Sequence, residues 1–222
     1  QKRDAVFPWS GKRWVEGQLM ARDTNTMSPR DRQEHLLEVI SSPRFLKKQG
    51  LGNEVPFFIS PFPAADAVEM EVVRTQLVKL LADRGVIALD INLYDLSVRI
   101  LRDRGIWDQL IEQEAGFSKD ELKELLQNVL DPEQHLIPEI AAGLEANEFD
   151  VLLLSGVGEV YPFIRSHNVL NNLQSTAKDK PTVMFFPGSY THALASGASL
   201  DLFGIMHDDK YYRAFNIFNY EV

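Results

Sequence analysis

The sequence predicts an α/β protein with three layers, in which helices cover both faces of a mainly parallel sheet. Short apolar runs of strand length alternate with longer stretches whose apolar residues recur at helical spacing. This alternation is typical of consecutive βαβ units. The run at 150–156, DVLLLSG, is apolar without interruption, as expected for a strand that is buried on both faces.

The expected strands are apolar runs that Gly, Pro or Asn residues interrupt. Pro187 is expected to end the pairing of the fourth strand, and Gly188 is expected to let the chain leave the sheet. The turn-rich segment that follows predicts a long loop before a terminal strand. In chain order, the strands are expected at 55–60, 86–92, 150–156 and 181–188, with the terminal strand within 211–222.

Helices are expected between these strands, and several carry start or stop signals. Ser28 before Pro29 is typical of a helix N-terminus, and Ser118 with Glu121 has the pattern of a capping box. Gly85 is expected to end the helix that precedes it. In chain order, the helices are expected from about 30 to 46, and at 66–85, 93–104, 119–130, 131–147 and 160–175.

The composition limits the classes of function. The 222 residues include 23 basic and 32 acidic side chains, and this net charge of −9 disfavours diffuse binding to nucleic acid or anionic lipid. The chain has no cysteine, which excludes disulfides, thiolate catalysis and cysteine metal ligands. No apolar run has the length of a membrane span, and the N-terminus shows no signal-peptide core. We therefore expect a soluble, cytoplasmic protein.

Residues 1–26 differ from the rest and predict an N-terminal extension or a cloning-derived segment, followed by a single domain at 27–222. The stretch SGKR at 10–13 has the Gly-Lys pair of a phosphate loop. However, Val6 stands where the first glycine belongs, and Arg13 stands where Ser or Thr belongs. We therefore reject this match.

A ligand site is expected beyond the carboxyl ends of the parallel strands. After the first strand, two prolines remove backbone donors that a phosphate cradle requires, and the Walker A and dinucleotide patterns are absent. After the second strand, Asp90, Asn92 and Asp95 could hold Mg²⁺. Helix capping by Asn92 and Asp95 explains these residues better.

The end of the third strand carries the richest set of candidates, and two interpretations stay open. Glu159 and His167 could form an acid–base or metal pair, because histidine titrates near neutrality. Alternatively, the glycines serve a tight turn and the aromatic residues pack. Recognition is favoured over catalysis here. The candidates are Gly156, Gly158, Glu159, Tyr161, Arg165 and His167.

Two later segments carry the remaining candidates. The stretch TVMFFPGSY at 182–190 fails the G-x-S-x-G pattern of a nucleophile elbow, so its candidates serve recognition rather than catalysis. The stretch at 202–218 combines acidic, tyrosine and arginine residues, which favours a protein contact or a role in closing the fold over a metal site. These candidates are Gly188, Ser189, Tyr190, Asp208, Asp209, Tyr211, Tyr212 and Arg213.

Several blocks in this order resemble the BrxB family, the small component of BREX bacteriophage-defence systems. They include LDINLYDLSVRIL, LSGVGEVYPFIRSHNVLNNLQ, VMFFPGSY and LDLFGIMHDDKYYRAFNIF. The resemblance covers about residues 30–222. It implies a domain similar to a P-loop ATPase core without the phosphate loop, and it supplies no established catalytic residue.

The resemblance implies a function as a component of a defence complex rather than as an enzyme. We expect a non-catalytic scaffold that binds the PglZ-type protein, which has an alkaline-phosphatase-like fold, with the AAA+-type ATPase as a second candidate partner. The alternative is a degenerate sensor of a nucleotide or phosphate ligand at the strand ends. No cofactor or metal is expected, and direct binding to nucleic acid is disfavoured by the charge.

Overall fold

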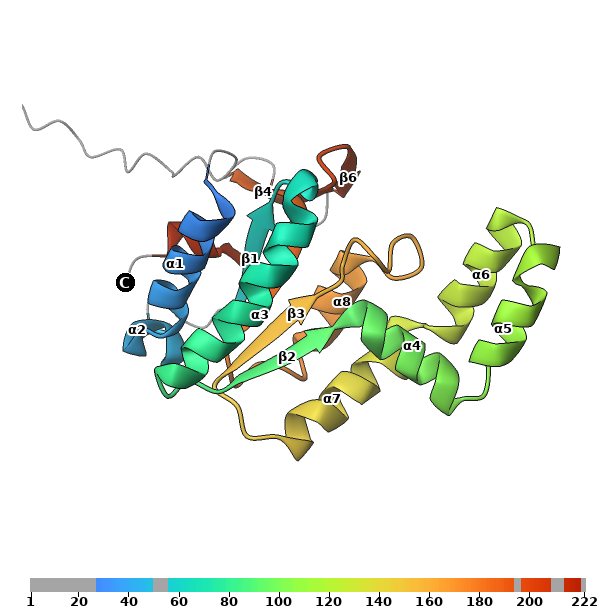
Figure 1. Ribbon diagram of the computed structural model, residues 1–222, viewed down its shortest axis with the longest axis horizontal. Helices are drawn as coiled ribbons and strands as arrows, with labels where there is room; N and C mark the ends of the chain where they lie inside the picture. Colours follow the sequence, from blue (N-terminus) through green and yellow to red (C-terminus); the bar gives the residue numbers. More distant parts are fainter. Residues whose placement is uncertain (1–26, 50–55, 194–196, 209–213, 221–222) are drawn as a thin grey trace, which may run out of the picture.

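The computed structural model describes residues 27–49, 56–193, 197–208 and 214–220 (Figure 1). The main sheet has parallel strands in the order β2-β3-β4-β1-β7, and an antiparallel hairpin extends it from the second half of β4. The predicted α/β class with a mainly parallel sheet is therefore confirmed. The strands are β1 (Phe57–Phe62), β2 (Ala88–Asn92), β3 (Val151–Ser155), β4 (Thr182–Ala193), β5 (Gly197–Leu202), β6 (Met206–Asp208) and β7 (Phe215–Asn216).

The helices follow most of the predicted boundaries. The α-helices are α1 (Pro29–Ile40), α2 (Pro43–Leu46), α3 (Ala67–Asp83), α4 (Leu93–Asp103), α5 (Trp107–Gln113), α6 (Lys119–Val129), α7 (Ile137–Ala146) and α8 (Ser166–Leu173). Short helical turns lie at Ala64–Asp66, Glu114–Gly116, Pro132–Leu136 and Ile217–Asn219. The sequence did not predict α5. The last expected helix begins only at residue 166, because the chain after β3 forms turns around Pro162, which cannot donate a helical hydrogen bond.

The three layers follow from the two faces of each buried strand. In β1, Phe58 and Phe62 pack in one core with α1 and α3, whereas Phe57 and Ile59 pack in the other core with α4, α7 and α8. Both cores are buried, which explains why the strands read as continuous apolar runs. Figure 1 shows α1 and α3 side by side, and α5 and α6 extending away from the sheet.

The predicted capping signals are confirmed. Ser28 accepts a hydrogen bond from the backbone N–H of Asp31 at 3.2 Å, and Ser118 accepts one from Glu121 at 3.3 Å. In return, the Glu121 carboxylate accepts from the Ser118 backbone N–H at 2.9 Å. Gly85 follows α3 with a φ of 76°, the left-handed conformation that a glycine adopts without strain.

The prediction that β4 ends at Pro187 is wrong. The strand continues to Ala193, and its partners change from β1 and β3 to β5 at this point. Pro187 lacks a backbone donor, but its carbonyl still accepts from the N–H of Phe203 at 2.8 Å. The expected long loop therefore contains two strands: β5 pairs with the second half of β4, where Gly188 faces Leu202, and β6 pairs with β5.

The expected terminal strand is present as β7, which pairs with β1 in parallel. After it, Ile217 and Phe218 are buried against α1 and α3. None of the helices in the described ranges combines the length and the hydropathy that a membrane span requires. The prediction for residues 1–26 lies outside the described residues.

The Gly188→Ala variant tests the close approach between β4 and β5. A Cβ atom at this position would lie 2.1 Å from the carbonyl oxygen of Asp201, which the strand pairing holds in place. We expect the free energy of unfolding to fall by about 3 kcal/mol, measured by urea denaturation. The control is Gly116→Ala, where the added Cβ meets no atom within 4 Å. Equal stability of the two variants would contradict this account.

Candidate functional site

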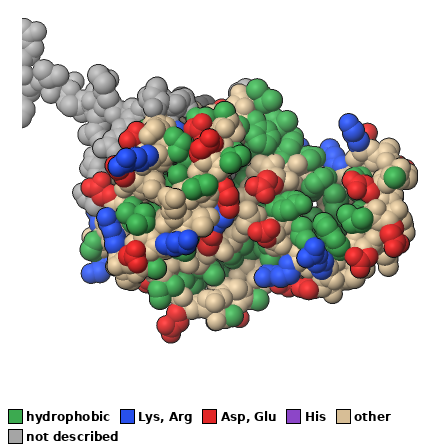
Figure 2. All heavy atoms as spheres, in the orientation of Figure 1, with side chains coloured by type: hydrophobic (Ala, Val, Ile, Leu, Met, Phe, Trp, Pro, Cys, Tyr) green, Lys and Arg blue, Asp and Glu red, His purple; other side chains and the backbone are tan. Residues whose placement is uncertain are grey.

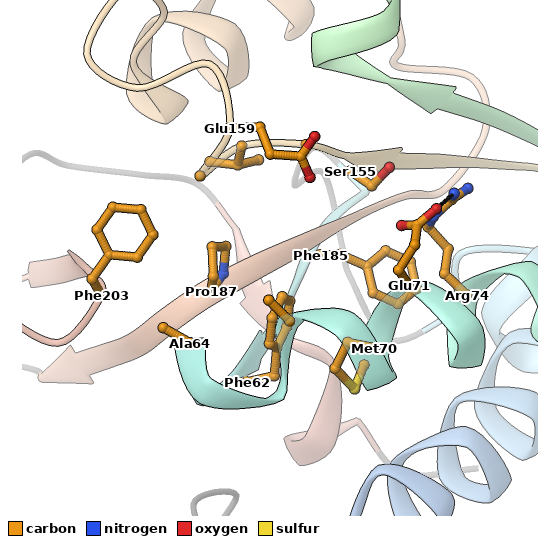
Figure 3. Close-up of a pocket in the computed structure, with 14 residues that line it drawn as sticks. Phe62, Ala64, Met70, Glu71, Arg74, Ser155, Glu159, Phe185, Pro187 and Phe203 are labelled. Carbon is orange, nitrogen blue, oxygen red and sulfur yellow. Dashed lines mark hydrogen bonds and ion pairs between the residues drawn. The ribbon is translucent and has the colours of Figure 1, made fainter.

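A pocket of about 250 Å³ lies at the carboxyl ends of β1 and β3 and beside Phe185 and Pro187 in the middle of β4 (Figure 3). From this edge, β1 continues into α3 on one face of the sheet, while β3 leads to α8 on the other face. Connections that diverge to opposite faces leave a crevice between neighbouring strands, and ligands of α/β sheets bind there. We refer to this pocket as the strand-end crevice.

One side of the strand-end crevice is apolar. Phe62 comes from the end of β1, Met70 from α3, and Phe185 and Pro187 from β4 (Figure 3). Phe203, in the turn after β5, lines the same space and is 37% exposed. These side chains form a wall suited to an aliphatic or aromatic group.

The opposite side carries carboxylates and a buried hydroxyl. Figure 3 shows Glu159 from the loop after β3, and Glu71 and Arg74 from α3, around the same space as Ser155. Ser155 is only 4% exposed. Its hydroxyl oxygen has no hydrogen-bond partner among the described residues, which is unusual for a buried polar group.

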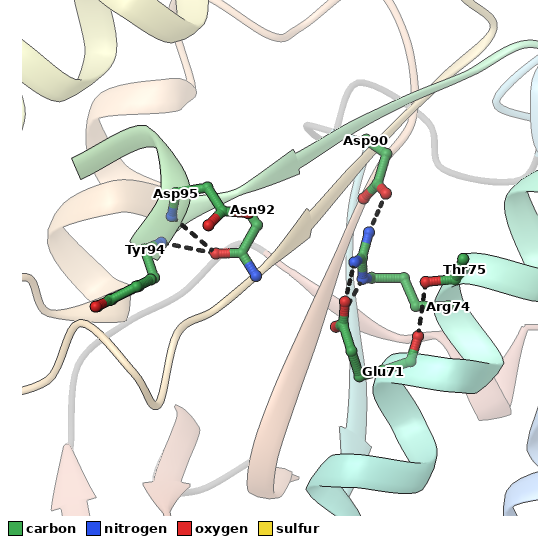
Figure 4. Close-up of polar contacts among 7 residues, drawn as sticks. All are labelled: Glu71, Arg74, Thr75, Asp90, Asn92, Tyr94 and Asp95. Carbon is green, nitrogen blue, oxygen red and sulfur yellow. Dashed lines mark hydrogen bonds and ion pairs between the residues drawn. The ribbon is translucent and has the colours of Figure 1, made fainter. Parts of the chain in front are cut away.

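Arg74 links α3 to β2 through two carboxylates (Figure 4). Its guanidinium binds Asp90 and Glu71, and its Nε donates to Glu71 at 3.1 Å. Burial acts to lower the pKa of Arg74, but the hydrogen bonds and charges of Glu71 and Asp90 outweigh it and raise the pKa. Burial, together with the negative charge of Glu71, raises the pKa of Asp90 more than Arg74 lowers it. The arginine is therefore firmly charged and is shared between two acids.

Glu159 is an acidic residue at the crevice that takes no part in this ion-pair network. It forms no ion pair with any described residue, although it borders the same crevice. Partial burial raises its pKa, and the negative charges of Glu71 and Asp95 raise it further. The crevice therefore holds more negative than positive charge.

Asn92 fixes the end of β2 and the start of α4. Its side-chain oxygen accepts from the backbone N–H groups of Tyr94 at 2.8 Å and Asp95 at 3.2 Å (Figure 4). The predicted capping role of Asn92 is thus confirmed. Gly156 lies against this cap with a φ of 77°, and a Cβ there would come within 2.5 Å of the Asn92 oxygen. The glycine after β3 is therefore required by the cap of its neighbour.

The other candidates after β3 have separate positions. Gly158 lets Phe203 approach, because a Cβ would lie 3.0 Å from the Phe203 ring. Tyr161 meets the same ring edge to face at 6.4 Å between centroids. Arg165 is exposed at the start of α8, whereas His167 is buried on that helix. Glu159 borders the crevice, whereas His167 is not among the residues that line it.

The candidates on β4 are engaged within the fold. Ser189 donates to Asp201 at 3.3 Å across the β4–β5 pair. The Tyr190 hydroxyl donates to the carbonyl of Ala214 at 2.6 Å, and burial raises the pKa of Tyr190 to about 12. The backbone of Asp208 pairs with β5. The remaining candidates, Asp209, Tyr211, Tyr212 and Arg213, lie outside the described residues.

Sequence reasoning missed several residues that line the crevice. Glu71 and Arg74 are spaced as an i,i+3 pair on a helix, a spacing also common on exposed helix faces. Ser155 stands at the end of an apolar run and was read only as part of a strand. The signal that could have found them is their position: all three lie near the carboxyl end of the sheet.

The fold and the crevice define an α/β protein in which prolines and carboxylates occupy the place of a phosphate-binding loop. The profile of the family "BREX protein BrxB" matches residues 89–217. A BREX protein BrxB of Bacillus cereus (strain H3081.97) is 32% identical over 191 residues, covering 84% of this chain and 96% of that protein. One of Escherichia coli O9:H4 (strain HS) is 29% identical over 178 residues, covering 80% and 86%. No solved structure matches significantly. The chain belongs to the BrxB family.

The Arg74→Met variant tests the ion-pair network. Arg74 is 9% exposed, so its loss leaves Asp90 and Glu71 facing each other without a cation. We expect a loss of about 2 kcal/mol in the free energy of unfolding, below the usual cost of breaking a buried pair because both acids reach solvent. Arg99→Met is the control, since its pair with Glu139 is exposed on both sides. If Arg74→Met loses no more stability than Arg99→Met, the ion-pair network does not stabilise the fold.

The Glu159→Gln variant tests the excess of negative charge. Because the folded state raises the pKa of Glu159 above its ordinary 4.5, the charged form is disfavoured in the folded protein. The resulting stability is present below pH 4.5 and is lost as the pH rises through the raised pKa. We expect the variant to be more stable than the wild type near neutral pH, and the difference to vanish in acid. Thermal unfolding across this pH range measures it, with Glu148→Gln as the control for loss of an exposed carboxylate elsewhere. A stability difference independent of pH would oppose the assignment.

Proposed function

We propose that this protein is a non-catalytic scaffold of a BREX phage-defence complex, which binds the PglZ-type protein and also the AAA+-type ATPase. Membership of the BrxB family supports a role in a BREX system. The observation that carries the scaffold role is the strand-end crevice. Its phosphate-loop position is occupied by Pro63 and a short helical turn, and the partly exposed Phe203 lines it.

The charge of the crevice supports this proposal over the alternative of a phosphate or nucleotide sensor. Arg74 is the single cation among the described residues that line or adjoin the crevice. The carboxylates of Glu71, Asp90 and Glu159 lie around it. Arg74 already binds two carboxylates, so a phosphate would meet repulsion without a free positive partner. A proline in place of a glycine-rich turn also removes a backbone donor.

The surface beside the crevice supports protein contact. Val68, at the start of α3, is 77% exposed, and Ile205, in the turn between β5 and β6, is 73% exposed. Phe203 and Met206 in the same hairpin are 37% and 36% exposed. Figure 2 shows hydrophobic side chains gathered at the upper edge, where Figure 1 places the start of α3 and β6. Apolar patches rimmed by polar residues are typical of protein-binding surfaces. We refer to Val68, Phe203, Ile205 and Met206 as the apolar rim.

Co-purification with the PglZ-type protein of the same BREX system tests the proposal. We expect the wild type to retain that protein, and Ile205→Asp to reduce retention at least about tenfold because a buried charge without a partner opposes association. Ile111→Asp is the matched control, since Ile111 is 53% exposed on α5, away from the apolar rim.

Both variants should fold, because both positions are solvent-exposed. If the wild type retains neither the PglZ-type protein nor the ATPase at low salt, the scaffold role is overturned. Retention that Ile205→Asp and Ile111→Asp reduce equally would place the contact away from the apolar rim.

A further inference from the structure

We propose that the strand-end crevice binds an organic cation with an aliphatic stem, that is, an alkylammonium or alkylguanidinium group. The group could belong to a free amine or to a lysine or arginine side chain. This site does not depend on the scaffold role. It follows from three features that converge in one pocket: an unpaired carboxylate, an unpartnered hydroxyl and an apolar wall.

The carboxylate that would hold the cationic head is Glu159. Glu71 is already bound to Arg74, so Glu159 is the acidic residue lining the crevice without an ion pair among the described residues. A bound cation would pair with Glu159 and would reduce its repulsion with Glu71. A charge-assisted hydrogen bond to a carboxylate is stronger than one between neutral groups.

The second partner is the hydroxyl of Ser155. This residue is 4% exposed, lines the crevice and leaves its oxygen without a hydrogen bond among the described residues. Figure 3 shows its oxygen on the same side of the crevice as the Glu159 carboxylate. A hydroxyl oxygen accepts a hydrogen bond from an ammonium or guanidinium group, so a ligand of this class would satisfy it.

The apolar wall suits the stem of the ligand. Met70, Phe185 and Phe203 line the crevice together with the polar groups, and Figure 3 shows Phe203 at the end away from Ser155. Long cationic side chains bury their methylene stems on such surfaces while the head reaches a polar partner. A hydrated metal ion would gain nothing from this wall, and no cluster of three metal-ligating side chains occurs within the described ranges.

Small probes with aliphatic stems of similar length test the chemistry. We expect n-pentylammonium and n-butylguanidinium to raise the melting temperature in a saturable way, because a ligand that binds only the folded state stabilises it. The neutral 1-pentanol and the anionic pentanoate have a similar stem without a cationic head. Equal shifts with 1-pentanol or pentanoate, or no saturable shift with either cation, would overturn the proposal.

Two variants identify the residues. We expect Glu159→Gln to weaken binding of n-pentylammonium by about tenfold, measured by titration calorimetry. We expect Ser155→Ala to weaken it by about fivefold without loss of stability, because the hydroxyl that it removes has no partner in the free protein. Ser60→Ala is the matched control. Its hydroxyl is also buried and unpartnered, but it does not line the crevice, so binding should be unchanged.

Unchanged affinity in both Glu159→Gln and Ser155→Ala would refute the site, even if a cation binds elsewhere. The source of the cation is decided by adding n-pentylammonium to the wild-type co-purification. Competition with the PglZ-type protein would support a partner side chain as the ligand, whereas retention unaffected by a bound probe would support a free amine. The probes are tested on the protein alone. A negative result would therefore refute the cation site without affecting the scaffold role, and loss of co-purification would refute the scaffold role without affecting the cation site.

Discussion

The close approach of Gly188 to the carbonyl of Asp201 is the constraint on which the strand-end crevice depends. It lets β4 continue past Pro187 and pair with β5. The turn after β5 then places Phe203, whose backbone N–H donates to Pro187 at 2.8 Å. Phe203 adopts a φ of 57°, which is costly for a residue with a side chain. Its ring in turn reaches Gly158 and Tyr161. One contact between backbones therefore sets one wall of the crevice.

A second set of contacts sets the opposite wall. Asn92 caps α4 and requires glycine at position 156, so the loop after β3 can leave the sheet only in one direction. Arg74 ties α3 to β2 through Asp90. Together these contacts fix the spacing between α3 and the loop that carries Glu159. The charges of the crevice are thus held by elements whose positions the core already determines.

The sequence predicted the layers well and the crevice poorly, for physical reasons. Continuous apolar runs and capping patterns are local signals, so β3, α3 and the box of Ser118 with Glu121 were predictable. The hairpin was missed because proline was treated as a strand end, although it loses a donor and keeps an acceptor. Glu159 was predicted as a candidate from its place after a strand. Ser155, Glu71 and Arg74 gain their significance from groups that the fold brings close, such as Asp90 beside Arg74, and an i,i+3 spacing alone does not distinguish them from an exposed pair.

The strand-end crevice shows how an α/β sheet can reverse the charge preference of its usual ligand position. A phosphate site needs free backbone N–H groups and an unpaired cation. Here Pro63 removes a donor and Arg74 is shared between Glu71 and Asp90. Once the cation is occupied, each further carboxylate shifts the crevice toward binding positive groups, and Glu159 is such a carboxylate. The crevice of this chain therefore keeps the place of a ligand position without a phosphate loop, and its excess of carboxylates favours a positive group there.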